Sequence, residues 1–316
     1  MKIFASHNQN NTIRLESSAG GIFSLIAENI LNQKGIVYGA AFDDNWNVYH
    51  RRIDSYDDLQ YLRRSKYVFS DYKNSLNSAI NDLKLGHKVL YVGVPCQIAA
   101  LRKLVGDNPD LLCIEVVCHG APKAEYWQKY LEELCSKLKR EKSEITEINF
   151  RDKRSGWKNY SFSIRFNDNT EFSQLHHDNL YMRAFLADYT LRHPCFKCKF
   201  KYPLGSCADI TLGDFWGISQ LAPEIDNDSG TTLIIARTPL GDEATRDIPI
   251  LKTVRFEDAV KYNPAISYSP QMPDQYEAFQ SYAKASPSVL RVFKKYTKLP
   301  LILRLKIKIH RILHRS

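Results

Sequence analysis

The sequence lacks several features that would set it apart from ordinary globular proteins. It has no run of about 18 apolar residues, so no segment is long enough to span a membrane as a helix. Its first residues, MKIFASHNQNN, lack the basic-then-apolar pattern of a secretory signal. No internal repeat or low-complexity segment occurs. With 44% hydrophobic and 25% charged residues over 316 positions, the chain has the composition of one large or two modest folded domains.

Acidic residues are missing from positions 278 to 316, where ten Lys and Arg residues occur. The whole chain has 44 basic and 35 acidic residues, so the remainder holds 34 basic (44 minus 10) and 35 acidic residues. Apolar side chains recur at helical spacing in residues 300–315, which predicts an interfacial helix on an anionic membrane surface. Docking of this helix on the protein itself or on a partner is the alternative. No nucleic-acid-binding motif accompanies the charge, so we expect no nucleic-acid partner.

Cysteine is present as an odd set of seven in a chain without an export signal. Such a set is typical of a reducing compartment, where cysteine patterns more often bind metals or catalyse reactions than form disulfides. We therefore expect a cytoplasmic protein, peripheral at the inner face of the cell membrane if the basic tail binds lipid.

Two strand–turn–helix units follow one another in the first half of the chain. Lys88–Val94 and Leu111–Val117 are predicted buried strands, and each leads through a polar turn into a helix. This order favours parallel strands, whose carboxyl ends collect ligands. Cys96 and Cys118 both follow such an end.

The fold class predicted from this pattern is α/β: a mixed sheet with parallel strand–turn–helix units, then a more antiparallel α+β part and a helical C-terminal tail. Short alternating strands after Glu144 carry the antiparallel expectation. The predicted divisions are residues 1–143, an N-terminal α/β part; 144–272, an α+β part with a CxxC loop; and 273–316, a basic helical tail.

The CxxC pair, Cys195 and Cys198, lies in a loop rich in Pro, Lys and Gly. Two thiolates at this spacing can bind one metal ion or one cluster, and Cys96 and Cys118 could complete a four-thiolate iron–sulfur site. A zinc site, a dithiol redox pair, and Cys96 as a nucleophile at a helix N-terminus stay open, because sulfur count alone does not separate them. Cys113 and Cys135 are expected to pack as small hydrophobic residues, and the role of Cys207 is ambiguous.

Two further segments have the composition of anion sites. The small residues Ser17, Ser18, Gly20 and Gly21 precede a predicted helix, whose N-terminal amides could bind a phosphate; an ordinary helix cap is the alternative. Arg151 and Lys153 belong to an Arg-Asp-Lys segment between two strands, which could hold an anionic ligand or form a solvated turn.

Eight segments, taken in order, resemble one family. They are SSAGGIFS, SKYVFSD, VGVPCQIAALR, VCHGAP, FRDKRSGWKNYS, YMRAFL, CFKCKF and ADITLGDFWGI. The set resembles the β-subunit family of coenzyme F-420 (8-hydroxy-5-deazaflavin) hydrogenases and dehydrogenases over about residues 13–258. The family also has short bacterial members in polysaccharide-biosynthesis loci.

The resemblance implies an oxidoreductase that holds FAD beside a [4Fe–4S] cluster and acts in bacterial surface polysaccharide biosynthesis. A non-enzymatic scaffold or a zinc-binding structural protein in the same pathway is the alternative. Carried over motif by motif, the cluster ligands would be Cys96, Cys118, Cys195 and Cys198. The implied flavin contacts would be Ser17, Ser18, Gly20, Gly21, Lys66, Tyr67, Gln97, Arg151 and Lys153.

The resemblance also concerns the partners of the chain. Many relatives begin with a ferredoxin-like cysteine-rich domain that precedes the matching region, so we expect a separate electron donor: ferredoxin, flavodoxin or a reduced coenzyme such as the deazaflavin. The catalytic residues and the substrate are not implied, and a homo-oligomer stays open.

Overall fold

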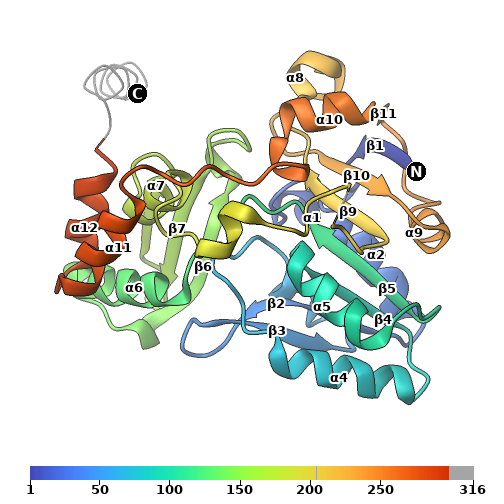
Figure 1. The fold of residues 1–316 in the computed structure, drawn as a ribbon, viewed down its shortest axis with the longest axis horizontal. Coiled ribbons are helices and arrows are strands. Elements are labelled where there is room, and N and C mark those ends of the chain that lie inside the picture. Colours follow the sequence, from blue (N-terminus) through green and yellow to red (C-terminus); the bar gives the residue numbers. More distant parts are fainter. Residues whose placement is uncertain (204, 299–316) are drawn as a thin grey trace.

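The computed structural model describes residues 1–203 and 205–298. It contains one eight-stranded sheet and one three-stranded sheet, which lie side by side in Figure 1. The strands of the large sheet are β1 (Lys2–Ser6), β2 (Ile36–Phe42), β3 (Val48–Ile53), β4 (Val89–Gly93), β5 (Leu111–Val116), β9 (Ile210–Asp214), β10 (Thr232–Ala236) and β11 (Lys252–Thr253). Those of the small sheet are β6 (Ile145–Asp152), β7 (Ser161–Phe166) and β8 (Glu171–Leu175).

The helices connect and cover these sheets. They are α1 (Asn11–Leu15), α2 (Ile22–Asn32), α3 (Leu59–Leu62), α4 (Lys73–Lys84), α5 (Pro95–Val105), α6 (Ala124–Leu138), α7 (Leu180–Leu186), α8 (Ile218–Leu221), α9 (Pro239–Ala244), α10 (Phe256–Tyr262), α11 (Tyr276–Ala285) and α12 (Val289–Tyr296). No helix in these described ranges is long and apolar enough to cross a membrane. The predicted interfacial helix of residues 300–315 lies outside the described residues.

The large sheet has the strand order β11-β1-β10-β9-β5-β4-β2-β3. Its central strands β2, β4, β5 and β9 are parallel, whereas both edges are antiparallel. The predicted mixed α/β fold with parallel strand–turn–helix units is therefore confirmed. The sheet takes β9, β10 and β11 from the chain after residue 144, so the first two predicted divisions contribute to one sheet; the division into domains stays a prediction.

Apolar side chains point to both faces of the central strands, which explains why helices cover both faces of the sheet. Val37, Leu90 and Leu112 pack on one face with residues of α2 and α3. Their neighbours in the chain point the other way, against α4 and α5. Because successive side chains of a strand alternate between faces, an almost continuous apolar run such as KVLYVGV is what a sheet covered on both sides requires.

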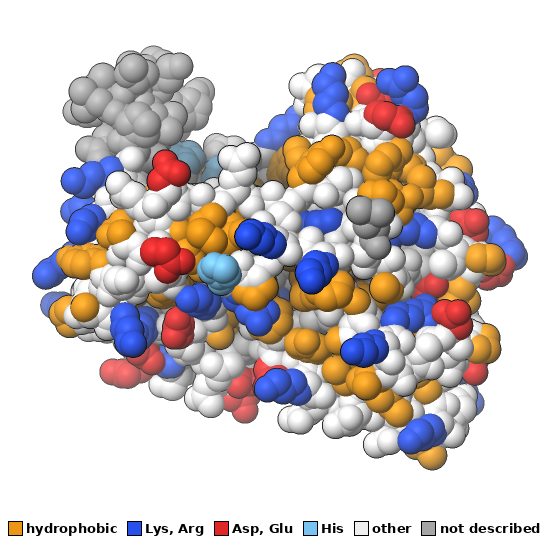
Figure 2. All heavy atoms as spheres, in the orientation of Figure 1, with side chains coloured by type: hydrophobic (Ala, Val, Ile, Leu, Met, Phe, Trp, Pro, Cys, Tyr) orange, Lys and Arg blue, Asp and Glu red, His pale blue; other side chains and the backbone are white. Residues whose placement is uncertain are grey.

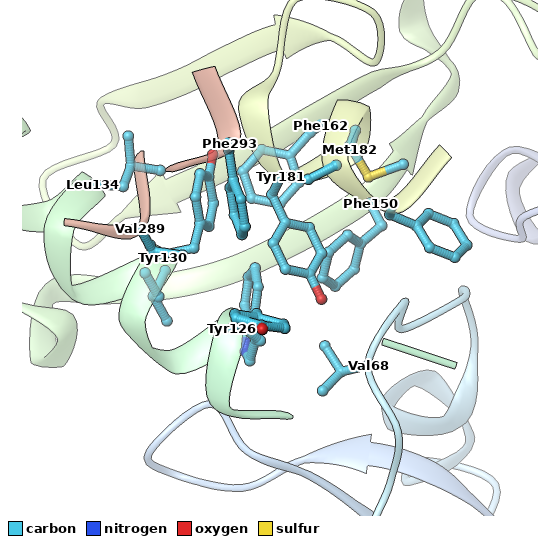
Figure 3. Packing of buried hydrophobic residues seen from close by; sticks show 14 of the residues in the cluster. Val68, Tyr126, Tyr130, Leu134, Phe150, Phe162, Tyr181, Met182, Val289 and Phe293 are labelled. Atoms are coloured by element: carbon cyan, nitrogen blue, oxygen red, sulfur yellow. The ribbon is translucent and has the colours of Figure 1, made fainter. Parts of the chain in front are cut away.

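The small sheet packs its inner face against a bundle of α6, α7, α11 and α12, and aromatic rings fill the space between them (Figure 3). Trp127 of α6, Phe150 of β6 and Tyr181 of α7 are fully buried there. The Tyr181 hydroxyl donates to the carbonyl of Tyr67 at 2.7 Å, so this core is tied to the segment that follows α3. The antiparallel register β6-β7-β8 confirms the expectation for residues after 144.

Candidate functional site

The first two candidate cysteines lie at neighbouring strand ends. Strands β4 and β5 pair in parallel, with Leu90 opposite Leu112, so their carboxyl ends meet at one edge of the sheet. Cys96 is the second residue of α5, directly after β4, and Cys118 follows β5. Strand β9 pairs in parallel with β5 and ends at the same edge with Asp214. The predicted position of both cysteines at a parallel sheet edge is confirmed.

The CxxC segment lies against the turn that contains Cys118. It forms a short 3-10 helix over His193–Lys197, near the centre of Figure 1. The backbone N–H of Ala121 donates to Cys195 Sγ at 3.4 Å, and a β-bridge joins Pro122 to Leu191. A Cβ atom at Gly120 would lie 2.6 Å from Leu191 Cδ1, so a larger residue at position 120 would displace the Leu191 side chain.

The four candidate thiols interact with one another electrostatically. Burial raises the pKa of Cys96 to about 11, and Cys198 and Cys195 contribute to the shift. Burial also raises the pKa of Cys118 to about 12, with Cys195, Cys96 and Cys198 contributing and the Lys201 cation opposing. All four cysteines are free thiols. A metal ligand is the thiolate, so metal binding would displace the protons of these thiols.

Among the described residues, these thiols do not form a group that could hold one small ion. Four thiolates around a single zinc ion, with Zn–S bonds of about 2.3 Å, lie about 3.8 Å from one another. Within residues 1–203 and 205–298, no group of three or more His, Cys, Asp or Glu side chains is placed to hold one metal ion. An iron–sulfur cube holds its thiolates further apart, since each thiolate binds a different corner iron.

The remaining cysteines lie elsewhere, as the sequence predicts for two of them. Cys113 is fully buried in β5 and Cys135 is buried in α6 among the aromatic residues of the small-sheet core. Cys207 is exposed.

Gln97 and His50 belong to a buried hydrogen-bond chain that holds the start of α5. Gln97 Oε1 accepts from the Val94 N–H at 3.0 Å, and its Nε2 donates to Ser70 Oγ at 2.8 Å. Ser70 Oγ and His50 Nδ1 are 3.1 Å apart, and His50 Nε2 is 3.0 Å from the Val92 carbonyl. The carbonyl must accept, so Nε2 carries the proton, and Nδ1 accepts from Ser70. The amide of Gln97, a predicted flavin contact, is thus engaged in positioning the turn of Cys96.

The buried hydrogen bonds of His50 predict a loss of stability in mild acid. Burial lowers the pKa of His50 to about 4. The folded state therefore binds fewer protons than the unfolded state between pH 4 and 6.5, and stability decreases as the pH falls through this window. From pH 7.5 to pH 5 the contribution of His50 amounts to about 2 kcal/mol. Urea unfolding of the wild type and of His50→Gln at both pH values measures it. A wild-type curve that changes with pH no more than the variant curve would contradict the prediction.

The small-residue loop before α2 is held by the edge of β10. The Gly20 N–H donates to Thr232 Oγ1 at 2.9 Å, and a Cβ at Gly20 would lie 2.7 Å from the Ser6 carbonyl. Gly21 precedes the helix with φ of +80°, a left-handed conformation that favours glycine. Ser17 Oγ donates to the Ile13 carbonyl at 2.7 Å. Close packing therefore requires glycine at position 20, and the left-handed backbone favours glycine at position 21.

Two predicted flavin contacts, Lys66 and Lys153, use their ammonium groups to brace loops. Lys153 Nζ donates to the carbonyls of Arg14, Ala19 and Ser229 at 2.6 to 2.8 Å. Burial, with the Arg151 and Arg14 cations, lowers the pKa of Lys153 to about 7.

Lys66 Nζ donates to the carbonyls of Tyr61 and Arg63 at 2.8 and 2.7 Å. Ser18 Oγ accepts from the Ser65 N–H at 2.6 Å, which joins the small-residue loop to the Lys66–Tyr67 segment. Sequence segments 17–21, 65–67 and 151–153 thus come together, as the resemblance implies; their direct contact with a flavin stays a prediction.

Arg151 differs from these residues because part of its guanidinium is unused. Its side chain is 2% exposed, and Nη1 donates to Asp214 Oδ2 at 2.6 Å. Nε and Nη2 are buried without a well-formed hydrogen bond in the described chain, although the Tyr67 hydroxyl lies close enough to interact with the guanidinium. The guanidinium lies over the rings of Tyr160 and Trp216. Buried donors without an acceptor are costly, so their presence points to a ligand with acceptor atoms.

Further polar atoms without partners lie around the same loops. His7 Nδ1 and Thr231 Oγ1 are both buried and lack a hydrogen-bond partner in the described chain. His7 precedes Asn8, whose N–H donates to the Gly20 carbonyl at 2.7 Å. Burial lowers the pKa of His7 to about 4, and the Arg14 and Lys153 cations contribute. This donor-rich, cationic surrounding suits an anionic ligand.

Sequence reasoning missed Asp214 and the partner of Trp216. The structure gives the two aromatic residues after Asp214 different environments: Phe215 is buried, whereas Trp216 is half-buried and stacks on Trp157 with ring centroids 4.7 Å apart. Trp157 Nε1 also donates to Asp214 Oδ1 at 3.2 Å. In the sequence, the only signal that these two segments meet is that Arg-Asp-Lys and Gly-Asp-Phe-Trp each lie at the end of a strand, with a glycine nearby.

Comparison with known proteins assigns the chain to a family of oxidoreductase components. Residues 86–261, more than half of the chain, match the model of the family that comprises the C-terminal part of the beta subunit of coenzyme F420 hydrogenase/dehydrogenase. The chain therefore belongs to this family, as the motifs of the sequence predict. The match includes all four candidate ligands, Cys96 to Cys198. No curated protein matches the chain.

A solved structure shares the fold. It is a chain of the F420-reducing [NiFe] hydrogenase complex from Methanosarcina barkeri, studied by xenon derivatization, with a TM-score of 0.56 and 14% sequence identity. The alignment covers 91% of this chain and 94% of the hydrogenase chain. The likeness therefore extends over the whole fold, including both sheets.

Proposed function

We propose that this protein is an oxidoreductase that holds FAD and a [4Fe–4S] cluster and acts in the assembly of bacterial surface polysaccharide. The observation that carries the proposal is that four free thiols from three chain segments lie close enough to interact electrostatically with one another. Members of the family generally bind iron–sulfur clusters. Cys96, Cys118, Cys195 and Cys198 would be the ligands, and soft thiolates are the ligands that such clusters require.

The residues near Arg151 fit FAD, the other group in this proposal. A flavin dinucleotide combines a flat ring with acceptor atoms and an anionic diphosphate. Arg151 has unused buried donors, and Trp216 offers a half-buried indole beside it. The cations of Arg14 and Lys153 lie next to the small-residue loop. These features support FAD binding between this loop and the Arg-Asp-Lys segment.

The two groups together would let the protein divide a two-electron reaction into single-electron steps. A bound flavin exchanges hydride with one partner and single electrons with another. The chain's own residues would hold the groups and shield them from water, and the cations of Arg151 and Lys201 would lie near them. The electron donor would be the deazaflavin coenzyme or a separate protein such as ferredoxin or flavodoxin.

Cofactor analysis of the anaerobically purified protein tests the proposal. We expect about four iron and four sulfide per chain, one flavin, and the brown colour of an iron–sulfur protein. Acid release followed by chromatography distinguishes FAD from FMN. A colourless protein with neither iron nor flavin would contradict the proposal, and if it still bound glycosyltransferases it would be a scaffold. Stoichiometric zinc in place of iron would favour a structural site.

The assignment to polysaccharide assembly follows from the resemblance to short bacterial relatives. It predicts that a strain without the gene produces altered surface polysaccharide, and that wild-type protein restores the product whereas Cys96→Ser protein does not. Restoration by Cys96→Ser would show that the protein acts there without its cluster.

A further inference from the structure

A hollow of about 890 Å³ opens beside the CxxC loop. It lies between this loop and α10, and its lining includes Cys198, Lys199, Lys201, Phe256, Lys261 and Tyr268. Figure 2 shows hydrophobic and basic side chains next to one another on this face of the molecule, below α10. Tyr268 is 64% exposed and adds an aromatic ring to the lining of the hollow.

The charge around the hollow is mainly of one sign. Its lining has three lysines, Lys199, Lys201 and Lys261, and a single acidic residue, Glu257. Lys199 and Lys261 are exposed and form no ion pair with the described residues. The loop from Arg192 to Lys201 has four Lys and Arg residues and no Asp or Glu. An approaching anionic surface would therefore meet the exposed ammonium groups of Lys199 and Lys261 on two sides of the hollow, with Glu257 and Asp258 beside Lys261 on α10.

The hollow is directly connected to the four thiols. Cys198 is one of them and also lines the hollow, where its backbone N–H donates to Ser269 Oγ at 3.0 Å. Lys201 makes the second connection, because its buried Nζ donates to the carbonyls of Cys118 and Ala265, the latter at 2.8 Å. No further layer of protein separates a molecule seated here from Cys198.

We propose that this surface docks an acidic protein electron carrier, which delivers electrons to the group held by the four cysteines. The inference rests on the proposed function. In each encounter the carrier would be oxidised by one electron and the thiolate-bound group reduced by one. Two encounters would supply the electron pair of a hydride transfer, with the proton taken from solvent. The geometry suits a protein partner because electron-transfer complexes are small, weak and steered by complementary charge around a few exposed aromatic contacts.

Charge reversal on the two exposed lysines tests the docking surface. The probe is an acidic [2Fe–2S] ferredoxin, and the variants are Lys261→Glu alone and Lys199→Glu with Lys261→Glu. The matched control is Lys84→Glu with Lys103→Glu, exposed lysines on α4 and α5; α4 lies at the other end of the molecule from α10 in Figure 1. At low ionic strength we expect the double variant to bind ferredoxin at least about tenfold more weakly, and the control to bind like the wild type.

Several readouts separate this inference from the proposed function. Iron content and bleaching by dithionite must equal those of the wild type in every variant, and reduction by ferredoxin must be slowed only in the lysine variants. Carbodiimide cross-linking to ferredoxin should be lost in the same variants. Unchanged ferredoxin binding in a variant that retains its cluster would overturn the docking proposal alone. Lysine variants that lose affinity only for a small anion such as pyrophosphate would also overturn it. A wild-type protein without iron would overturn the proposed function instead.

Discussion

The Cys118→Ser variant is expected to lose nearly all of its iron and sulfide together with the brown colour. Serine keeps the shape of the side chain but replaces a soft sulfur with a hard oxygen, which iron–sulfur clusters bind poorly. Cys118 lies at the end of β5, where Lys201 and the CxxC segment both contact its turn, so the other three thiols cannot readily close the gap. Iron and sulfide analysis and the visible spectrum after anaerobic reconstitution measure the loss.

The chain offers two matched controls for this prediction. Cys135→Ser alters a buried thiol in α6, and Cys207→Ser alters an exposed thiol; both variants should keep the full iron content. The circular dichroism spectrum of Cys118→Ser should equal that of wild-type apoprotein, which separates loss of a ligand from unfolding. Retention of the cluster by Cys118→Ser, with its loss in Cys207→Ser, would show that the ligand set is different from the one proposed here.

The second large effect is expected at Asp214. This carboxylate is the ion-pair partner of Arg151, whose side chain is 2% exposed. The Asp214→Asn variant would leave a buried guanidinium without its counter-charge, and such a change costs about 3–5 kcal/mol of the free energy of unfolding. Urea denaturation of the apoprotein at neutral pH measures this cost.

A double variant isolates the pair from other effects of the substitution. Removing both charges, in Arg151→Met with Asp214→Leu, should recover much of the stability lost in Asp214→Asn, because no unpaired charge remains. It should still fail to retain flavin, since the buried donors of Arg151 are gone. The Asp258→Asn control removes an ion pair with the largely exposed Arg255 and should change stability little. If Asp214→Asn and the double variant were equally unstable, the pair would not be the cause.

Local sequence patterns predicted the elements near the cysteines well. Alternation and apolar runs indicated β4, β5 and the helix after each, and parallel pairing placed Cys96 and Cys118 at one edge. Strand β1 was missed, because KIFAS is short and pairs with β10, which is more than two hundred residues away in the sequence. No local pattern encodes a pairing of that kind.

The roles of the predicted flavin contacts show a second limit of sequence reasoning. Motif matching selected Gln97, Lys66 and Lys153 together with Arg151. In the structure the polar atoms of Gln97, Lys66 and Lys153 form hydrogen bonds with backbone groups or with Ser70. By contrast, Nε and Nη2 of Arg151 lack a hydrogen-bond partner among the described residues. Which groups form hydrogen bonds depends on the distances between atoms in the folded chain, and these distances cannot be read from the spacing of residues in the sequence.

The sequence by itself determined the family and the parallel strand–turn–helix order and selected the four candidate thiols, because these depend on residue identity and on contacts between near neighbours. Only the tertiary structure decided which side chains brace the site and which remain available to a ligand. It also brought Asp214 and Trp216 to Arg151, and set the lysine-rich hollow beside Cys198. The physical reason is that these features arise where segments far apart in the chain pack together, and packing is a property of the whole fold.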